Sequence, residues 1–246
     1  MKVQLKNILQ FLVRYRAFMA RGIQAINRQH RQQFEDVLRD AIVLETVDYV
    51  LKNILDAEHF ISRNELWDFC IYKFSKNNNL VNNELVFAEF GVWKGESINY
   101  FAQKIPDLRF IGFDSFEGLE EDWPGIGHKA GHFNTGGKLP SVQGNVQLVK
   151  GWYSNTLPNY LRLNPHAFDD LRILHLDSDT YTPTKFILDT LETYLRPGTI
   201  IVFDEYFGYL GYKEHEFKAF KEFIERTGRK YKYIGFTSMQ VAVELL

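Results

Sequence analysis

The stretch LVFAEFGVWKGES at residues 85–97 decides the fold. Its first half is apolar and of strand length, and Gly91 and Gly95 then allow a tight turn into a short helix expected over residues 96–104. The turn differs from the GxGxxG fingerprint, and Glu96 would repel a pyrophosphate at the start of that helix. We therefore expect either a site for a cationic or zwitterionic ligand or an ordinary strand–helix turn.

Strand and helix segments alternate from this stretch to the end of the sequence. Further strands are expected over residues 109–114, 146–149, 171–177 and 199–204, and further helices over residues 183–195 and 215–226. Two closing strands, residues 230–236 and 239–245, are close enough in sequence to form a hairpin, which would make the last strand antiparallel. The alternation predicts an α/β domain over residues 81–246 with a mostly parallel sheet and helices on both faces.

Residues 1–80 predict a helical N-terminal extension. Apolar residues recur at three- and four-residue steps from Leu5 onward, and basic residues accompany them. A second helix is expected over residues 37–55, and Ser62 and Glu65 form a capping box for a third. The basic first helix could lie on an anionic membrane surface or dock on a partner. We expect instead that it packs on its own domain or forms a homo-oligomer through N-terminal helices.

Composition narrows the function classes. The 246 residues are 45% hydrophobic with a net charge of -2, which excludes wholesale disorder and disfavours nucleic-acid binding. Cys70 is the single cysteine, so no internal disulfide, Cys-rich zinc ribbon or CxxC redox site can form. No apolar stretch reaches the roughly 18 residues of a transmembrane segment. The N-terminal run lacks the features of an export signal, and a cytoplasmic location is expected.

The residues that follow each strand are the candidate site, because ligands bind beyond the carboxyl ends of the strands in an open α/β sheet. Asp114 ends the second strand about 20 residues beyond Gly91, where an acidic side chain can accept hydrogen bonds from ribose hydroxyls. Ser115 and Phe116 follow, and the aromatic ring could cover a nucleobase. A helix N-cap is the alternative. The two features together favour a nucleoside ligand.

Acidic residues follow the fourth and fifth strands. The sequence reads Asp177-Ser178-Asp179 at one end and Asp204-Glu205 at the other. Adjacent strands would bring Asp177, Asp204 and Glu205 together, and clustered carboxylates repel one another unless a cation joins them. Their oxygen atoms suit magnesium, manganese or calcium. Metal binding is the favoured interpretation, and capping of the loop starts is the alternative.

A glycine-rich segment between the second and third strands carries His128 and His132. Their spacing is that of a helical metal pair, but the surrounding glycines oppose a helix, so zinc is disfavoured. A lid that brings a histidine base to the site is the better hypothesis, with two exposed loop histidines as the alternative. The aromatic segment 206–212 could wall a substrate pocket or belong to the core.

Taken together, these motifs resemble class I S-adenosylmethionine-dependent methyltransferases. More narrowly they resemble the macrocin O-methyltransferase type, which methylates sugar hydroxyls in antibiotic pathways. The resemblance covers residues 60–246 and rests on EFGVWKG at 89–95, DSFEGL at 114–119, LDSD at 176–179, and PG at 197–198 with DEY at 204–206. It implies a Rossmann-like sheet of seven strands with the last strand antiparallel, and S-adenosylmethionine as cofactor.

The resemblance also implies roles for individual residues. It places the methionine end of the cofactor near Glu89, Gly91 and Ser97, the ribose at Asp114, and the adenine beside Ser115 and Trp152. Asp177, Asp204 and Glu205 match the divalent-metal positions of related metal-dependent O-methyltransferases, which implies Mg²⁺. Thr180 stands where catechol-type relatives carry a lysine base, so His128 or His132 is the expected base and Asp179 the fallback.

The predicted function is therefore magnesium-assisted O-methylation of a hydroxyl on a sugar, polyol or natural product. Methyl transfer is an in-line displacement, which depends on holding donor and acceptor aligned. A cation and a base would make an alcohol a better nucleophile. The alternatives are a metal-independent small-molecule methyltransferase and a non-catalytic adenosine-nucleotide-binding protein.

Overall fold

The computed structural model describes residues 2–77 and 85–246, and the side chains of residues 2–20 and 22–27 lie outside this description. The chain forms two compact units, Met1–Glu45 and Thr46–Leu246. Helix α1 (Lys2–Asn53) is continuous, so the prediction of a separate helix starting near residue 37 is wrong. No glycine or proline interrupts residues 28–53. The amphipathic face predicted from Leu5 onward falls outside the described side chains.

The second unit is built around one sheet. Its strands are β1 (Glu58–His59), β2 (Val86–Phe90), β3 (Arg109–Asp114), β4 (Val146–Lys150), β5 (Leu171–Leu176), β6 (Ile200–Phe203), β7 (Tyr231–Phe236) and β8 (Val241–Leu245). Their order is β1-β7-β8-β6-β5-β2-β3-β4. Only β8 is antiparallel to its neighbours β6 and β7, and the other described pairs are parallel. The predicted Rossmann-like sheet is thus confirmed, with the two-residue β1 added at its edge.

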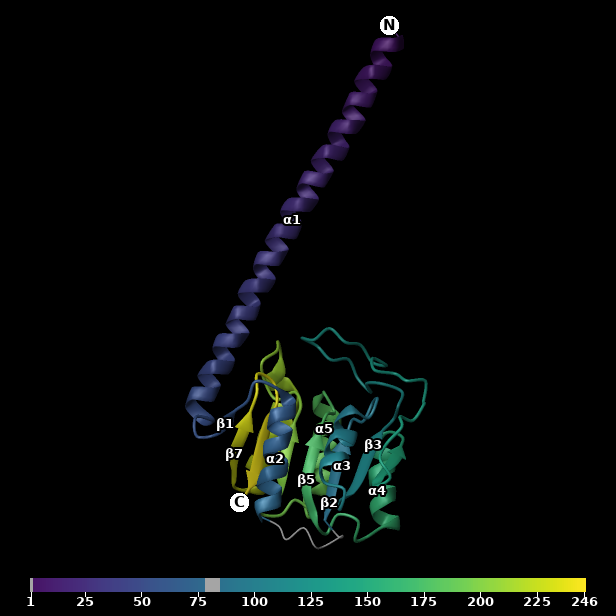
Figure 1. Cartoon of the computed structure of the whole chain (residues 1–246). Coiled ribbons are helices and arrows are strands. Elements are labelled where there is room, and N and C mark those ends of the chain that lie inside the picture. The colour runs from purple at the N-terminus through teal and green to yellow at the C-terminus, as the bar shows by residue number, and fades with distance from the viewer. Residues whose placement is uncertain (1, 78–84) are drawn as a thin grey trace. The chain divides into compact units, whose positions relative to one another are not determined.

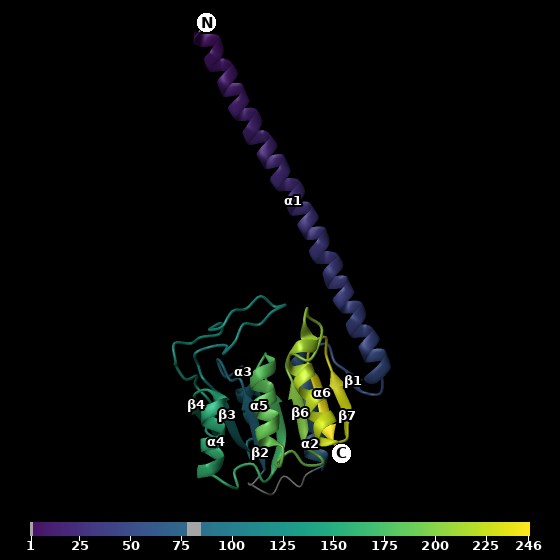
Figure 2. The same cartoon turned by 180° about the vertical axis from the view of Figure 1, so that it is seen from behind.

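Helices cover both faces of this sheet (Figures 1 and 2). Helices α2 (Arg63–Asn77) and α3 (Glu96–Lys104) pack on one face. Helices α4 (Tyr153–Leu163), α5 (Tyr181–Leu191) and α6 (Glu216–Thr227) pack on the other. Because the central strands are covered on both sides, β2, β6 and β8 are buried along their whole length, which explains their apolar sequences.

The sequence pattern predicts the start of α2 but not helix α4. The predicted capping box forms, since the Ser62 hydroxyl accepts from the Glu65 backbone N–H at 3.3 Å and the Glu65 carboxylate accepts from the Ser62 N–H at 3.2 Å. Helix α4 was not predicted, because Pro158 lies inside it and proline normally interrupts a helical pattern. A short 3-10 helix η1 (Tyr212–Glu214) precedes α6.

The strand order creates a topological switch point between β2 and β5. From β2 the chain proceeds outward through β3 and β4, and from β5 it proceeds in the opposite direction through β6. The loops that leave the carboxyl ends of β2 and β5 therefore separate and open a crevice, which is where ligands bind in such sheets. Within residues 2–77 and 85–246, no helix is long and apolar enough to cross a membrane.

Candidate active site

A pocket opens at the carboxyl ends of β2, β3 and β5. Its lining includes six of the residues proposed from the sequence, namely Gly91, Asp114, Ser115, Trp152, Asp177 and Asp179. The side chains of Trp93, Phe133 and Tyr153 add aromatic surface to its wall. The fold thus brings together candidates that are almost 90 positions apart in the chain, at the switch point where a ligand site is expected.

Asp114 fixes the loop that follows β2. Its Oδ2 accepts hydrogen bonds from the backbone N–H groups of Val92 and Trp93 at 2.8 and 2.7 Å, and its Oδ1 accepts from the Phe116 N–H at 2.6 Å. Trp93 and Phe116 both have left-handed backbone angles, with φ of 47° and 58°, conformations that non-glycine residues rarely adopt. Hydrogen bonds to the Asp114 carboxylate therefore hold two strained turns at the pocket wall.

Gly91 lies where the two central loops come closest. Its φ is 99°, and a Cβ at this position would lie 1.7 Å from the carbonyl oxygen of Asp177. The backbone that follows β5 thus packs directly against this glycine. Only glycine allows this approach without displacing Asp177.

A buried polar network lies beneath the turn. Glu89 accepts a hydrogen bond from the Ser97 hydroxyl at 2.9 Å, and its other carboxylate oxygen lies 2.9 Å from Nδ1 of His175. Nε2 of His175 lies 3.7 Å from Oδ1 of Asp204. Burial alone would lower the pKa of His175, but contact with the Asp204 and Glu89 carboxylates outweighs it and raises the pKa to about 10. His175 on β5 therefore connects Glu89 on β2 with Asp204 at the end of β6.

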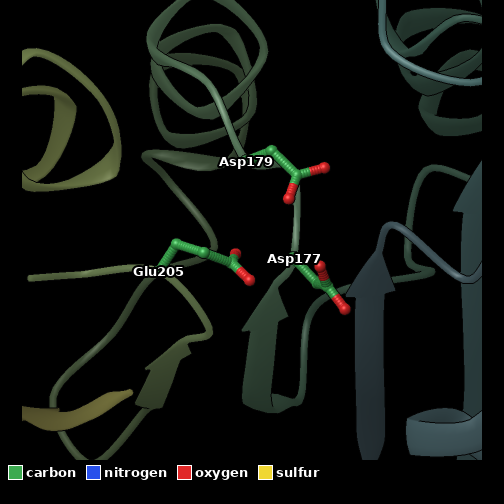
Figure 3. Close-up of side chains that lie close together, drawn as sticks. All are labelled: Asp177, Asp179 and Glu205. Carbon is green, nitrogen blue, oxygen red and sulfur yellow. The ribbon is translucent and has the colours of Figure 1, made fainter. Parts of the chain in front are cut away.

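Three carboxylates gather beside this network. One oxygen each from Asp177, Asp179 and Glu205 lies within 4.8 Å of the others (Figure 3). Burial, and then the neighbouring negative charges, raise the pKa of all three groups well above the ordinary value. In the described part of the chain, Oε2 of Glu205 is buried without a hydrogen-bond partner. Mutually repelling oxygen ligands with a buried unsatisfied atom fit a divalent cation.

This cluster differs in one member from the predicted metal set. Asp179 belongs to it, whereas Oδ1 of Asp204 faces His175. Asp179 reaches the cluster because its backbone is left-handed, with φ of 64°. No sequence pattern predicts this conformation for an aspartate. A role for Asp204 as a metal ligand stays a prediction.

Glu216 is a further site residue that the sequence reasoning missed. It is fully buried on α6 and accepts hydrogen bonds from the backbone N–H groups of Ser178 at 3.4 Å and Glu205 at 3.1 Å. It therefore anchors both acidic loops. Burial raises the pKa of Glu216 to about 8. His175 was missed as well, although it is the one polar side chain near the end of the apolar strand LRILHL.

The two loop histidines pack against each other. The rings of His128 and His132 stack with centroids 3.6 Å apart. Neither lines the pocket described above, but His132 lines a wider neighbouring pocket that shares Trp93 and Phe133 with it. Burial, and then the His132 charge, lower the pKa of His128. A histidine base stays a prediction, while Asp179 lies in the first pocket itself. In the aromatic segment, Tyr206, Phe207 and Tyr212 belong to the core.

Comparison with known proteins agrees with this geometry. Residues 88–206 match a family model described as a methyltransferase domain. The calicheamicin methyltransferase CalS11 is 20% identical, with a TM-score of 0.56 over 85% of this chain and 92% of its own. The O-methyltransferase NovP is 22% identical, with a TM-score of 0.56 over 74% of this chain and 78% of its own. No curated protein matches the sequence significantly.

The structural likenesses establish the fold, and the family match covers the segment that carries the pocket. Residues 88–206 include the turn after β2, the Asp114 loops and the acidic ends of β5 and β6. Residues 88–206 are therefore similar to methyltransferase domains, and the chain shares its fold with the methyltransferases CalS11 and NovP.

Proposed function

We propose that the protein transfers the methyl group of S-adenosylmethionine to a hydroxyl of a small molecule, with a divalent cation such as Mg²⁺ at the acidic cluster. One observation carries the proposal: Asp177 and Asp179 of the acidic cluster line the same pocket as the nucleoside-binding candidates Asp114, Ser115 and Trp152. A second structure of CalS11 is described as that of a TDP-rhamnose 3'-O-methyltransferase. It is 21% identical to this chain, and the two match with a TM-score of 0.51 over 84% of this chain and 90% of CalS11. This name supports a sugar or natural-product hydroxyl as acceptor.

The donor would occupy the pocket with its ribose at Asp114 and its adenine beside Ser115 and Trp152. The Asp114 carboxylate has lone pairs beyond the three hydrogen bonds it already accepts, so ribose hydroxyls can still donate to it. The positively charged sulfonium suits the neighbouring acidic corner. Positioning of donor and acceptor at near-attack distance is the main task of such a site.

Asp177, Asp179 and Glu205 would hold the cation, and Glu216 would keep their loops in place. A bound divalent cation lowers the pKa of a coordinated hydroxyl and so supplies a better nucleophile. In Figure 3 one oxygen of Asp179 turns toward the other two carboxylates and the second turns away from them. We propose that this second oxygen accepts the acceptor's proton, with His132 of the neighbouring pocket as the rival base.

The test measures methyl transfer to hydroxylated acceptors, such as nucleotide-linked sugars, with and without excess chelator. We expect turnover that stops with chelator and returns with Mg²⁺. Asp177→Asn should abolish turnover but spare S-adenosylhomocysteine binding, while the same change at the exposed Asp107 should alter neither. Full activity in chelator would leave a metal-independent methyltransferase. Cofactor binding without turnover on any acceptor would favour a non-catalytic adenosine-nucleotide-binding protein.

We also propose that a second copy of the chain covers one face of α1. Phe34, Val37, Leu44 and Leu51 are each 59–69% exposed, and their spacing of three and then seven residues matches the seam of a coiled coil. Leu44→Asp should shift the chain from dimer to monomer in sedimentation equilibrium. Val43→Asp is the matched control, because Val43 is also exposed but lies off this seam. A wild-type monomer at micromolar concentration would refute the proposal.

A further inference from the structure

Arg63 is a partly exposed cation that lies between α2 and α3. It is the first residue of α2, and its Nη2 forms an ion pair with Glu96 Oε1 of α3 at 2.7 Å. The guanidinium carbon lies 5.1 Å from the centre of the Trp67 ring. The side chain is 38% exposed, so it is open to a ligand while being held on two sides.

Arg63 is also connected to the interior of the site. The Trp67 ring makes an edge contact with His175 at 5.8 Å between centroids, and His175 bridges Glu89 and Asp204. Burial tends to lower the pKa of Arg63, but the carboxylates of Glu96, Asp204 and Asp177 outweigh it, and the net shift is upward. The guanidinium thus interacts electrostatically with Asp204 and Asp177 as well as with Glu96.

The proposed donor poses an electrostatic problem for the crevice at the ends of β2 and β5. The methionine end of S-adenosylmethionine carries an ammonium, a sulfonium and a carboxylate. Buried acids at β2, β5 and β6 suit the two cations but repel the carboxylate. A cation on the protein near the methionine end would offset this repulsion and strengthen binding of the carboxylate.

Arg63 stands at the turn where that end is expected. Its partner Glu96 precedes Ser97, and the Ser97 hydroxyl donates to Glu89. The sequence resemblance places the methionine moiety at Glu89, Gly91 and Ser97. A guanidinium presents five N–H donors, so it can hold the Glu96 carboxylate and a second carboxylate together.

We propose that Arg63 binds the α-carboxylate of S-adenosylmethionine. The proposal rests on the proposed function and adds a residue from α2, outside residues 88–206 of the family match. The alternative ligand for this carboxylate is Lys94, which lies in the turn after β2. Its Nζ lies 4.1 Å from the centre of the Trp93 ring.

The experiment removes the two interacting groups separately. Calorimetry measures the binding of S-adenosylhomocysteine and of its decarboxylated analogue, S-adenosyl-3-thiopropylamine, to wild type and to Arg63→Gln. We expect Arg63→Gln to weaken S-adenosylhomocysteine binding about tenfold or more and to leave the analogue's affinity unchanged. Arg63→Lys should restore part of the loss, because a single ammonium replaces the planar fork.

Lys104→Gln is the matched control. Lys104 pairs with Asp68 at 3.1 Å, so it also joins α3 to α2, and its side chain is 48% exposed. This variant should bind both ligands like wild type. If it weakens S-adenosylhomocysteine as much as Arg63→Gln does, the effect comes from the helix contact and the proposal is wrong.

Two further outcomes would overturn the proposal. An equal loss of both ligands in Arg63→Gln would mean that Arg63 does not recognise the carboxylate. Unchanged S-adenosylhomocysteine affinity in Arg63→Gln, with a loss in Lys94→Gln, would assign the carboxylate to Lys94. Failure of the wild-type protein to bind either ligand would instead refute the proposed function, and this inference with it.

Discussion

Replacing Gly91 with alanine tests whether the two central loops must touch. The added Cβ would lie 1.7 Å from the Asp177 carbonyl oxygen, whereas real contacts of this kind stay above 3.0 Å, so a backbone shift of at least about 1.3 Å is required. That shift pulls on the bonds from the Asp177 N–H to Phe90 at 2.9 Å and from the Gly91 N–H to Phe113 at 3.0 Å. Left-handed φ costs about 1–2 kcal/mol for alanine. Weakened hydrogen bonds and packing bring the expected loss of unfolding free energy to about 3–5 kcal/mol.

Gly127→Ala measures the energetic cost of a left-handed backbone at alanine without a steric clash. Gly127 has φ of 85°, and nothing lies within 4 Å of the Cβ position, so we expect a loss of only about 1–2 kcal/mol. Urea unfolding of both variants and the wild type gives the two values. Equal losses in the two variants would refute the claim that contact with Asp177 constrains Gly91.

Three further predictions concern the pocket. Asp114→Asn leaves a backbone N–H facing the donor NH2 group of the new side chain. It should lower the free energy of unfolding by about 2 kcal/mol and weaken S-adenosylhomocysteine binding. Glu117→Gln, a change at an exposed neighbour, should have neither effect. In chelator, the native state holds a proton on Glu216 that the unfolded chain loses, so stability should fall as the pH rises from 4.5 to about 8. Glu216→Gln should reduce this slope without removing it, because the pKa values of Asp177, Asp179 and Glu205 are raised as well. An unchanged slope measured by urea unfolding would contradict the assignment. Asp179→Asn should lower kcat by at least about 100-fold, whereas His132→Ala should lower it by less than about threefold. Initial-rate assays measure both effects. A larger loss of kcat in His132→Ala than in Asp179→Asn would make His132 the base.

Local sequence signals predicted much of the fold. The bounds expected for α3 and β3, residues 96–104 and 109–114, agree with the structure because glycine and proline turns flank both elements. The closing hairpin was predicted because residues 230–236 and 239–245 are close in sequence. Helix α4 was missed because Pro158 argues against it locally, and its packing on β3 and α5 outweighs that argument. The strand β1 is only two residues long and has no periodicity to detect.

Some residues of the candidate site could likewise be predicted from local sequence, and others could not. Asp114, Asp177 and Glu205 could be proposed from sequence because each follows an apolar strand. His175 and Glu216 could not, because their roles come from contacts with Glu89 and Ser178, which are 86 and 38 positions away. The choice between Asp179 and Asp204 depends on the backbone rotation after β5, and a strand pattern carries no information about that rotation.

The most direct test of the account is a crystal structure of the protein with S-adenosylhomocysteine and Mg²⁺. We expect the ribose at Asp114, the adenine beside Trp152, and the metal ion among Asp177, Asp179 and Glu205, all in one crevice at the ends of β2 and β5. Density for the nucleoside on another surface, or a metal ion bound away from these carboxylates, would contradict the central claim.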